Sequence, residues 1–448
     1  MTENMSPQIE LRFLQSRIQP FAQTLLGGVC LQAPKATMTR APLDLVACID
    51  VSGSMDGAKL DRAKESLIKL VEHLSSSDRL GIVAFESEVH RVIDLTPMDA
   101  SGKERARQRI SSLHTGGITA MSGGLQASLE LLAEARRPDA LRRVLLFTDG
   151  HANSGLSSGD VDGFATLLHH HSKGVNVSWF GYGEDHDGEF LSALAQLSHG
   201  NYHQTPNAEA ILDAFGRELG GLLSVVATAL QVMVRPCPGG GVPTFLNDFP
   251  TASEAGSVTL SFPELYAEER RWIVFELPFA APSDPAPGKR PLVEVEVFWN
   301  ALPAGEADRI SLVGEVELVG ESVQLSPPDA ELQAQIAILR GAAAQRAAAA
   351  LVHAGKFADA ELVVMQAAKE AKALGTPLGE QLASVLTDAA ANYGNEERFI
   401  SVRSSLANLR QGMGRSRASG TRLDSLFESV DQTWMKENFR AGKKPKPQ

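Results

Sequence analysis

Oxygen-bearing side chains follow two apolar stretches of this sequence in a pattern that suits a hard divalent cation. Asp50, Ser52 and Ser54 alternate directly after the run LDLVACI, and Asp149 ends the run RRVLLFT. Thr119 follows a glycine pair ahead of an apolar stretch with helical spacing. Carboxylate and hydroxyl oxygens are the kind of ligand that hard cations take in proteins. Together the five side chains predict a metal site with two carboxylates and three hydroxyls.

The charge balance of this predicted site favours Mg²⁺ and a further ligand from outside. Mg²⁺ prefers octahedral oxygen coordination and usually keeps several waters, whereas two carboxylates are too few for a good all-protein Ca²⁺ cage. Because three of the five side chains are neutral hydroxyls, the protein compensates the charge of the ion only in part. We therefore expect Mg²⁺, with Mn²⁺ or Ca²⁺ as alternatives, and a site that readily accepts an incoming carboxylate.

Apolar strands alternating with amphipathic helices must position these side chains. The pattern between residues 43 and 222 predicts a doubly wound parallel sheet, a fold in which ligands bind at the carboxyl ends of the strands. The expected strands are 43–50, 79–85, 142–149 and 175–183, with an antiparallel edge strand at 89–95. The expected helices are 60–74, 103–113, 124–136, 160–172, 188–198 and 207–223.

The hydrophobic pattern changes after this region. Alternating apolar runs separated by Pro/Gly turns predict an antiparallel β-sandwich over residues 223–326, with Trp272, Phe298 and Trp299 in its core. Five long runs are few for a closed sandwich, and an apolar stretch before residue 34 has no partner nearby. We therefore expect the α/β domain to be inserted in a sandwich whose first strands come from residues 1–42.

An alanine-rich helical domain is expected over residues 327–411. A helix pair around Gly355, with Leu362 in its apolar stripe, resembles one tetratricopeptide hairpin. One such unit is too short for a solenoid, so a local helical bundle is the expected arrangement. Residues 412–448 are expected to form a mobile loop, a short helix and a basic tail.

The ligand pattern resembles a known metal site. The D-x-S-x-S motif that begins at Asp50, the GGIT segment with Thr119, and the TDG segment with Asp149 resemble the metal-ion-dependent adhesion site (MIDAS) of von Willebrand factor type A domains. The resemblance covers roughly residues 43–220. It continues into the β-region found in bacterial stand-alone proteins and in plant ubiquitin ligases that combine a RING finger with such a domain.

This resemblance implies a Rossmann-like fold and divalent-cation-dependent protein binding, with Mg²⁺ the usual ion. The implied ligands are Asp50, Ser52, Ser54, Thr119 and Asp149, and a partner's Asp or Glu completes the coordination. The chain is then an adaptor or scaffold and not an enzyme. Ligase activity is not expected, because a RING needs clustered zinc ligands and the three cysteines are scattered.

Composition argues against other classes. A net charge of −12 disfavours nucleic-acid binding, and the longest uncharged apolar runs are too short to span a membrane. Unpaired cysteines and an acidic N-terminus without an apolar core favour the cytoplasm of a bacterium. Two alternatives stay open. One is a metal-dependent hydrolase with Asp50 as nucleophile, although Ser52 stands where such sites carry a second acid. The other is a regulatory subunit of an AAA+ ATPase.

Each predicted ligand taken alone has an ordinary structural role. Asp50 suits a turn and Thr119 a helix N-cap, so only their joint placement at strand ends favours a metal. Two further groups of residues have metal-binding side chains. His169–His171 are consecutive on a helix and cannot face one another, so a solvated helix end is expected. Asp185–Asp187 are expected to form a polar loop.

Overall fold

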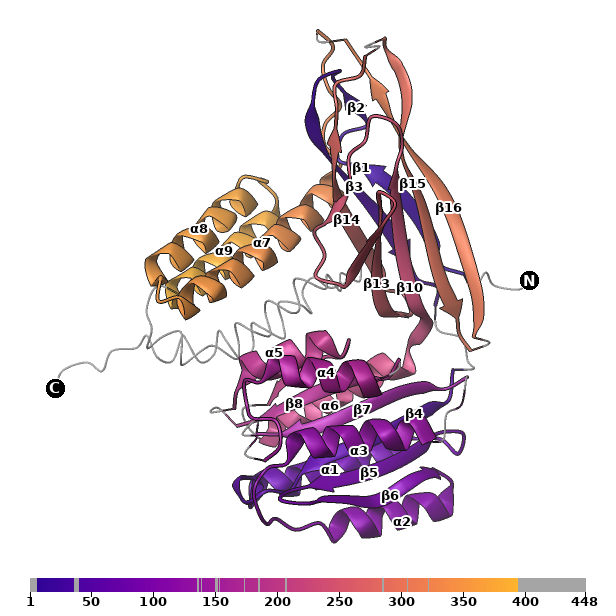
Figure 1. The fold of residues 1–448 in the computed structure, drawn as a ribbon, viewed down its shortest axis with the longest axis vertical. Helices are drawn as coiled ribbons and strands as arrows, with labels where there is room; N and C mark the ends of the chain where they lie inside the picture. Colours follow the sequence, from indigo (N-terminus) through magenta and orange to yellow (C-terminus); the bar gives the residue numbers. More distant parts are fainter. Residues whose placement is uncertain are drawn as a thin grey trace, which may run out of the picture.

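A computed structural model of the chain describes residues 6–35, 40–134, 137, 139–149, 152, 154–172, 174–183, 186–205, 208–283, 286–303, 305–320 and 322–393. The loop, helix and basic tail expected over 412–448 lie outside these residues. An α/β domain, a two-sheet β-region and a group of helices make up the described chain (Figure 1). The predicted fold class is confirmed: the α/β domain is inserted in an antiparallel β-sandwich and helices follow it.

The α/β domain is built on a six-stranded sheet of order β6-β5-β4-β7-β8-β9. Only β6, at one edge, runs antiparallel to its neighbour, as the sequence predicts. All eight residues of β4, one of the two strands in the middle of the sheet, are buried, because helices cover both faces of a parallel sheet. The strands are β4 (Leu43–Asp50), β5 (Arg79–Phe85), β6 (Val89–Pro97), β7 (Leu141–Thr148), β8 (Asn176–Tyr182) and β9 (Tyr202–Thr205).

Six helices cover this sheet, three on each face. One face packs α1 (Ala58–His73), α2 (Ala100–Ser111) and α6 (Ala208–Leu223) into one apolar core. The other face packs α3 (Met121–Glu134), α4 (Val161–His171) and α5 (Gly188–Leu197) into a second core. The last helix, α6, ends next to the first strand of the β-region after it, so the two parts are joined by a very short connection.

The β-region consists of two antiparallel sheets that share one core. One sheet has the order β1-β3-β14-β11 and the other β12-β13-β10-β15-β16-β2, in which only the short β2–β16 pair is parallel. The strands are β1 (Gln8–Phe13), β2 (Arg17–Ile18), β3 (Gln23–Gln32), β10 (Val225–Pro236), β11 (Thr244–Phe245), β12 (Thr251–Glu254), β13 (Ser257–Tyr266), β14 (Arg270–Phe279), β15 (Gly288–Ala301) and β16 (Glu306–Leu318). The N-terminal strand β3 pairs along its whole length with β14, so chain segments on both sides of the α/β domain build the sandwich.

Side chains from both sheets meet in the sandwich core. Val29 and Phe275 from one sheet, together with Val232 and Val297 from the other, are completely buried there. Trp299 also lies in this core, as predicted, whereas Phe298 is only half-buried. The two short strands β11 and β12 were not predicted.

Three helices lie at the C-terminal end of the described residues, and the first of them begins on the outer face of the sandwich. They are α7 (Ala330–His353), α8 (Phe357–Lys372) and α9 (Pro377–Tyr393). The first turns of α7 bury Leu332 against Trp272, and the rest of α7 packs with α8 and α9. The prediction for Trp272 was therefore wrong in one respect: it is buried outside the sandwich core, under a helix. Gly28 permits this close approach, because a Cβ there would lie 2.7 Å from the side chain of Leu332.

The helical hairpin also departs from expectation at one position. Leu362, assigned to the apolar stripe, is 67% exposed on α8, and Met365 beside it is 40% exposed. Val364 and Ala368 form the buried face instead. Among the described helices, none is long and apolar enough to cross a membrane.

Truncation of Leu332 tests the docking of α7 on the sandwich. Leu332→Ala is expected to lower the free energy of unfolding by about 2–3 kcal/mol, because a completely buried leucine leaves a cavity. Leu362→Ala makes the same chemical change at an exposed site and is expected to change stability by less than about 0.5 kcal/mol. Urea unfolding followed by circular dichroism measures both, and equal effects would contradict the docking.

Candidate metal centre

The first ligand loop begins where β4 ends. Asp50 is the last residue of β4 and is completely buried, and a single 3₁₀ turn (Gly53–Met55) follows. Ser52 is buried and Ser54 exposed, and their hydroxyl oxygens lie 3.2 Å apart. This turn therefore places a pair of hydroxyls beside a buried carboxylate, with one of them open to solvent.

Backbone hydrogen bonds fasten the three ligand loops to one another. The amide of Gly116 donates to the carbonyl of Val51 (2.8 Å), and that of Gly53 donates to Gly117 (3.3 Å). The carbonyl of Thr119 accepts from the amide of Ser154 (3.1 Å), in the loop after β7. The structure thus brings the loops that carry the five predicted ligands together at the carboxyl edge of the sheet.

The second loop depends on glycine at residue 117. Its φ of +57° is unfavourable for other residues, and a Cβ there would lie 1.8 Å from Oε2 of Glu86. Thr119, two residues later, is 1% exposed at the entry to α3. Gly117, and not Gly116, therefore lets the loop pass close to its neighbours.

Both oxygens of Asp50 accept hydrogen bonds. Oδ1 accepts from the backbone amide of Ser52 (2.9 Å) and Oδ2 from Oγ1 of Thr148 (2.8 Å). Burial raises the pKa of Asp50 to about 6, and the nearby charge of Asp149 adds to this, although the hydrogen bonds from Ser52 and Thr148 oppose it. The carboxylate is thus held in one orientation in a place where its negative charge is costly.

Of the two predicted carboxylate ligands, Asp149 has fewer hydrogen-bond partners. Its side chain is 1% exposed, and its Oδ1 has no hydrogen-bond partner. Its Oδ2 lies 3.3 Å from Nζ of Lys59, in the first turn of α1. A buried carboxylate oxygen without a partner is costly, and a cation is a ligand that would satisfy it.

The donor set fits a hard divalent cation. Two carboxylates and three hydroxyls on three tied loops match the oxygen ligands that Mg²⁺ takes while it keeps some waters. Within the described residues no group of three or more His, Cys, Asp or Glu side chains is arranged to hold a metal. A metal held at this edge would therefore depend on hydroxyls as much as on carboxylates.

The other residues with metal-binding side chains have structural roles. His169 and His170 are exposed in the last turn of α4, as predicted, whereas His171 is half-buried and its Nδ1 lies 3.8 Å from Oε1 of Glu130. Asp185 lies outside the described residues, and Asp187 caps α5 by accepting from the amide of Phe190 (3.1 Å). His186 lies in the predicted loop between β8 and α5, where it is completely buried over Gly181 and hydrogen-bonded to the hydroxyl of Tyr202.

The sequence analysis missed an ion network between the α/β domain and the sandwich. Arg143 in β7 is 1% exposed and donates from Nη2 to both oxygens of Glu264 in β13 (2.6 Å each). Its Nη1 lies 3.6 Å from Oε1 of Glu218 in α6, and His203 also contacts Glu218 (2.9 Å). A charged residue within an apolar strand was the available signal, since such a side chain needs a buried partner.

The pKa of Glu218 reflects this network. Burial alone would raise it, but the hydrogen bond with His203 and the charge of Arg143 lower it well below its ordinary range. Burial likewise opposes the charge of Arg143, and the charges of Glu264 and Glu218 outweigh it, so the pKa of Arg143 is raised. These groups therefore remain ionised while buried.

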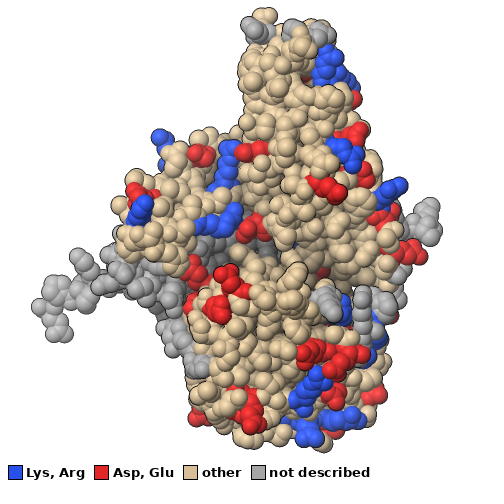
Figure 2. All heavy atoms as spheres, in the orientation of Figure 1, with Lys and Arg blue, Asp and Glu red and all other residues tan. Residues whose placement is uncertain are grey.

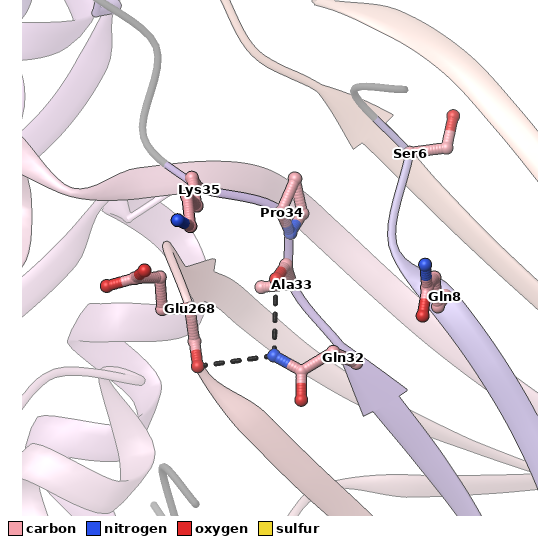
Figure 3. Close-up of a pocket in the computed structure, with 7 residues that line it drawn as sticks. All are labelled: Ser6, Gln8, Gln32, Ala33, Pro34, Lys35 and Glu268. Atoms are coloured by element: carbon pink, nitrogen blue, oxygen red, sulfur yellow. Dashed lines mark hydrogen bonds between the residues drawn. The ribbon is translucent and has the colours of Figure 1, made fainter. Parts of the chain in front are cut away.

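Surface features away from the ligand loops offer no comparable donor set. A cavity of about 300 Å³ lies where β3 leads out of the sandwich, and Gln32 in its wall donates to the carbonyls of Ala33 and Glu268 (Figure 3). On the face drawn in Figure 2, Lys and Arg side chains are interspersed with Asp and Glu. This mixed pattern differs from the continuous basic surface that nucleic-acid binding needs.

Comparison with known families matches the fold and its location in the chain. Residues 44–217 match the model of the family described as von Willebrand factor type A domain. The chain is 31% identical over 282 residues to E3 ubiquitin-protein ligase WAV3 of Arabidopsis thaliana. The matched region covers 60% of this chain and 35% of the plant protein. It is 27% identical to inter-alpha-trypsin inhibitor heavy chain H3 of Mus musculus, covering 41% and 21% of the two chains. The chain therefore spans about a third or less of these two relatives.

Two solved structures resemble almost the whole chain. A von Willebrand factor type A protein from Catenulispora acidiphila has a TM-score of 0.68 and 17% identity, covering 93% of this chain and 98% of that one. The ArnB paralog VWA2 from Sulfolobus acidocaldarius has a TM-score of 0.61 and 15% identity, covering 92% and 100%. At these identities the likeness concerns the fold alone, and it includes the sandwich and the helices.

Proposed function

Residues 44–217 form a von Willebrand factor type A domain, and we propose that this domain docks a partner protein through a divalent cation. The cation is Mg²⁺, and its ligands are Asp50, Ser52, Ser54, Thr119 and Asp149. An Asp or Glu carboxylate of the partner completes its coordination. The chain then acts as an adaptor or scaffold.

One observation carries this proposal. The buried Oδ1 of Asp149 has no hydrogen-bond partner, at an edge where the loops of three hydroxyl ligands are tied together. A cation bound there gives that oxygen a ligand, whereas a purely structural role for Asp149 leaves it unexplained.

The surroundings of the site suit a protein partner. Ser54, Gly116 and Gly117 are exposed, so the ion can be reached from solvent. Ile118, between Gly117 and the ligand Thr119, exposes 50% of its surface. An apolar side chain on the rim of a charged site is a contact that a folded partner would cover.

The hydrolase alternative is less well supported by the geometry of Asp50. A carboxylate nucleophile needs a free oxygen that faces the substrate. Both oxygens of Asp50 accept hydrogen bonds, and its side chain is completely buried. This geometry supports a role for Asp50 in holding an ion more than an attack on a substrate.

Affinity capture with and without the ion tests this function. Proteins retained on the immobilised chain in Mg²⁺ are expected to be released by EDTA, and Thr119→Val, which keeps the shape of a 1% exposed side chain, is expected to retain none of them. Ile118→Ser is expected to weaken capture without changing Mg²⁺ binding, as calorimetric titration with MgCl₂ would measure. Identical sets of captured proteins in Mg²⁺ and in EDTA would contradict the proposal.

A further inference from the structure

A lysine side chain contacts one of the proposed ligands of the candidate metal site. Lys59 is in the first turn of α1, and its Nζ lies 3.3 Å from Oδ2 of Asp149. The carboxylate is 1% exposed, whereas the lysine side chain is 33% exposed. An ammonium group thus reaches the buried carboxylate from the solvent side of the site.

We propose that Lys59 is a built-in competitor of the divalent cation. This inference rests on the proposed function. In the metal-free protein the ammonium of Lys59 partly neutralises Asp149 from Oδ2, and it is repelled when an ion binds the other oxygen, Oδ1, of the same carboxylate. Lys59 therefore lowers the affinity of the site for the ion alone.

The charges at the site support this role. Asp50 and Asp149 are both buried, and the negative charge of Asp149 raises the pKa of Asp50, so the metal-free site needs a positive charge. Lys59 is the cation that contacts Asp149 in the structure. Because a divalent cation and an ammonium repel each other at short range, the two cannot share the carboxylate of Asp149 without loss of binding energy.

The side chain of Lys59 is suited to leave. A lysine carries a point charge on a flexible four-carbon stem, and its ammonium is strongly hydrated. Since a third of this side chain already contacts solvent, the ammonium can withdraw towards the rim without exposing the core. A guanidinium or a buried lysine would leave less readily.

The displaced lysine also defines which ligand the loaded site prefers. The formal charges of the two carboxylates, the divalent cation and the ammonium of Lys59 on the rim sum to one positive charge. A single carboxylate from a partner balances that charge. Lys59 thus couples the two binding events: it weakens the ion when the ion is alone and favours the ion together with an acidic ligand.

Lys59→Met tests the competition directly. Methionine keeps much of the length of the side chain and removes the charge. We expect the Mg²⁺ dissociation constant, measured by calorimetry with MgCl₂, to fall about tenfold, because the ion no longer displaces a cation from a buried carboxylate. Lys59→Arg keeps the charge and, because a guanidinium leaves the carboxylate less readily, is expected to bind Mg²⁺ no more tightly than the unmodified chain. Lys69→Met, at an exposed position of the same helix, is expected to change nothing.

A second measurement separates this inference from the proposed function. In EDTA, Lys59→Met is expected to unfold at a lower temperature than the unmodified chain, and saturating Mg²⁺ is expected to remove that difference. Normal Mg²⁺ binding with an unchanged dissociation constant in Lys59→Met would overturn the inference and leave the function intact. No Mg²⁺ binding by either protein would overturn the proposed function and this inference together.

Discussion

Arg143→Met is expected to destabilise the folded chain by about 3–5 kcal/mol, the usual cost of removing one partner from a buried ion pair. Without Arg143, the carboxylates of Glu264 and Glu218 remain buried with no arginine to neutralise them. Methionine fills most of the volume, so the loss reflects charge more than packing. Urea unfolding followed by circular dichroism measures it.

An exposed arginine provides the matched control. Arg91 pairs with Glu134 at a distance of 2.8 Å, but both side chains are largely in solvent, so Arg91→Met is expected to cost less than about 1 kcal/mol. The double variant Arg143→Met/Glu264→Gln is expected to recover part of the lost stability, since one unpaired buried charge is then removed. Equal costs for the Arg143 and Arg91 variants would show that the network carries no special stability.

This network also bears on how the chain is assembled. Arg143 lies in β7, whose C-terminal end leads to the candidate ligand Asp149, while Glu264 belongs to the sandwich and Glu218 to the helix that connects them. Asn176 and Tyr266 donate further hydrogen bonds to Glu264 (3.1 and 3.0 Å). The α/β domain and the sandwich are therefore joined by directional contacts, which define their relative orientation more sharply than apolar contacts alone.

Asp50→Asn is expected to abolish measurable Mg²⁺ binding and yet to stabilise the metal-free protein at neutral pH. The variant removes one of only two carboxylate ligands, which explains the first effect. It also removes a buried negative charge, which explains the second. The expected gain in EDTA at pH 7.5 is about 3 kcal/mol, the value of a pKa raised from 3.8 to about 6.

The sign of the pH dependence follows from the same pKa. The folded state holds the proton of Asp50 up to about pH 6, whereas the unfolded state releases it near pH 3.8. Between these values the folded state binds more protons, so the contribution of Asp50 to the free energy of unfolding is lost as the pH rises. The advantage of Asp50→Asn in EDTA is therefore expected to be small near pH 4 and complete above about pH 7.

Two measurements check this prediction. Calorimetry with MgCl₂ reports the loss of ion binding, and thermal unfolding in EDTA at several pH values reports the gain in stability. Glu86→Gln, a carboxylate removed near the site but outside the ligand set, serves as the control for binding. A variant that binds Mg²⁺ normally, or that is less stable than the unmodified chain at pH 7.5, would contradict the assigned role of Asp50.

Local pattern in the sequence determined the α/β domain and the candidate ligands. A strand buried on both faces needs a continuous apolar run, and the run that ends at Asp50 has no other plausible structure. Because parallel strands place their carboxyl ends at one edge, the sequence order alone predicted that Asp50 and Asp149 would come together. The apolar stretch that forms β3 has no predicted partner strand nearby in the sequence, so it needed one from elsewhere in the chain. Residues 270–279 form that strand.

Only the tertiary structure decided which long-range partners the charged and aromatic residues found. Lys59 reads as an ordinary surface lysine, since nothing local indicates that its ammonium will reach a carboxylate ninety residues away in the chain. Trp272 reads as sandwich core because strand periodicity does not reveal that helix α7 covers the outer face. Arg143 and Glu264 stand 121 residues apart. The hydrophobic period and the composition of a segment indicate whether its residues are buried. The pairing of buried charges depends instead on how the sheets and helices pack on one another, which the whole chain determines.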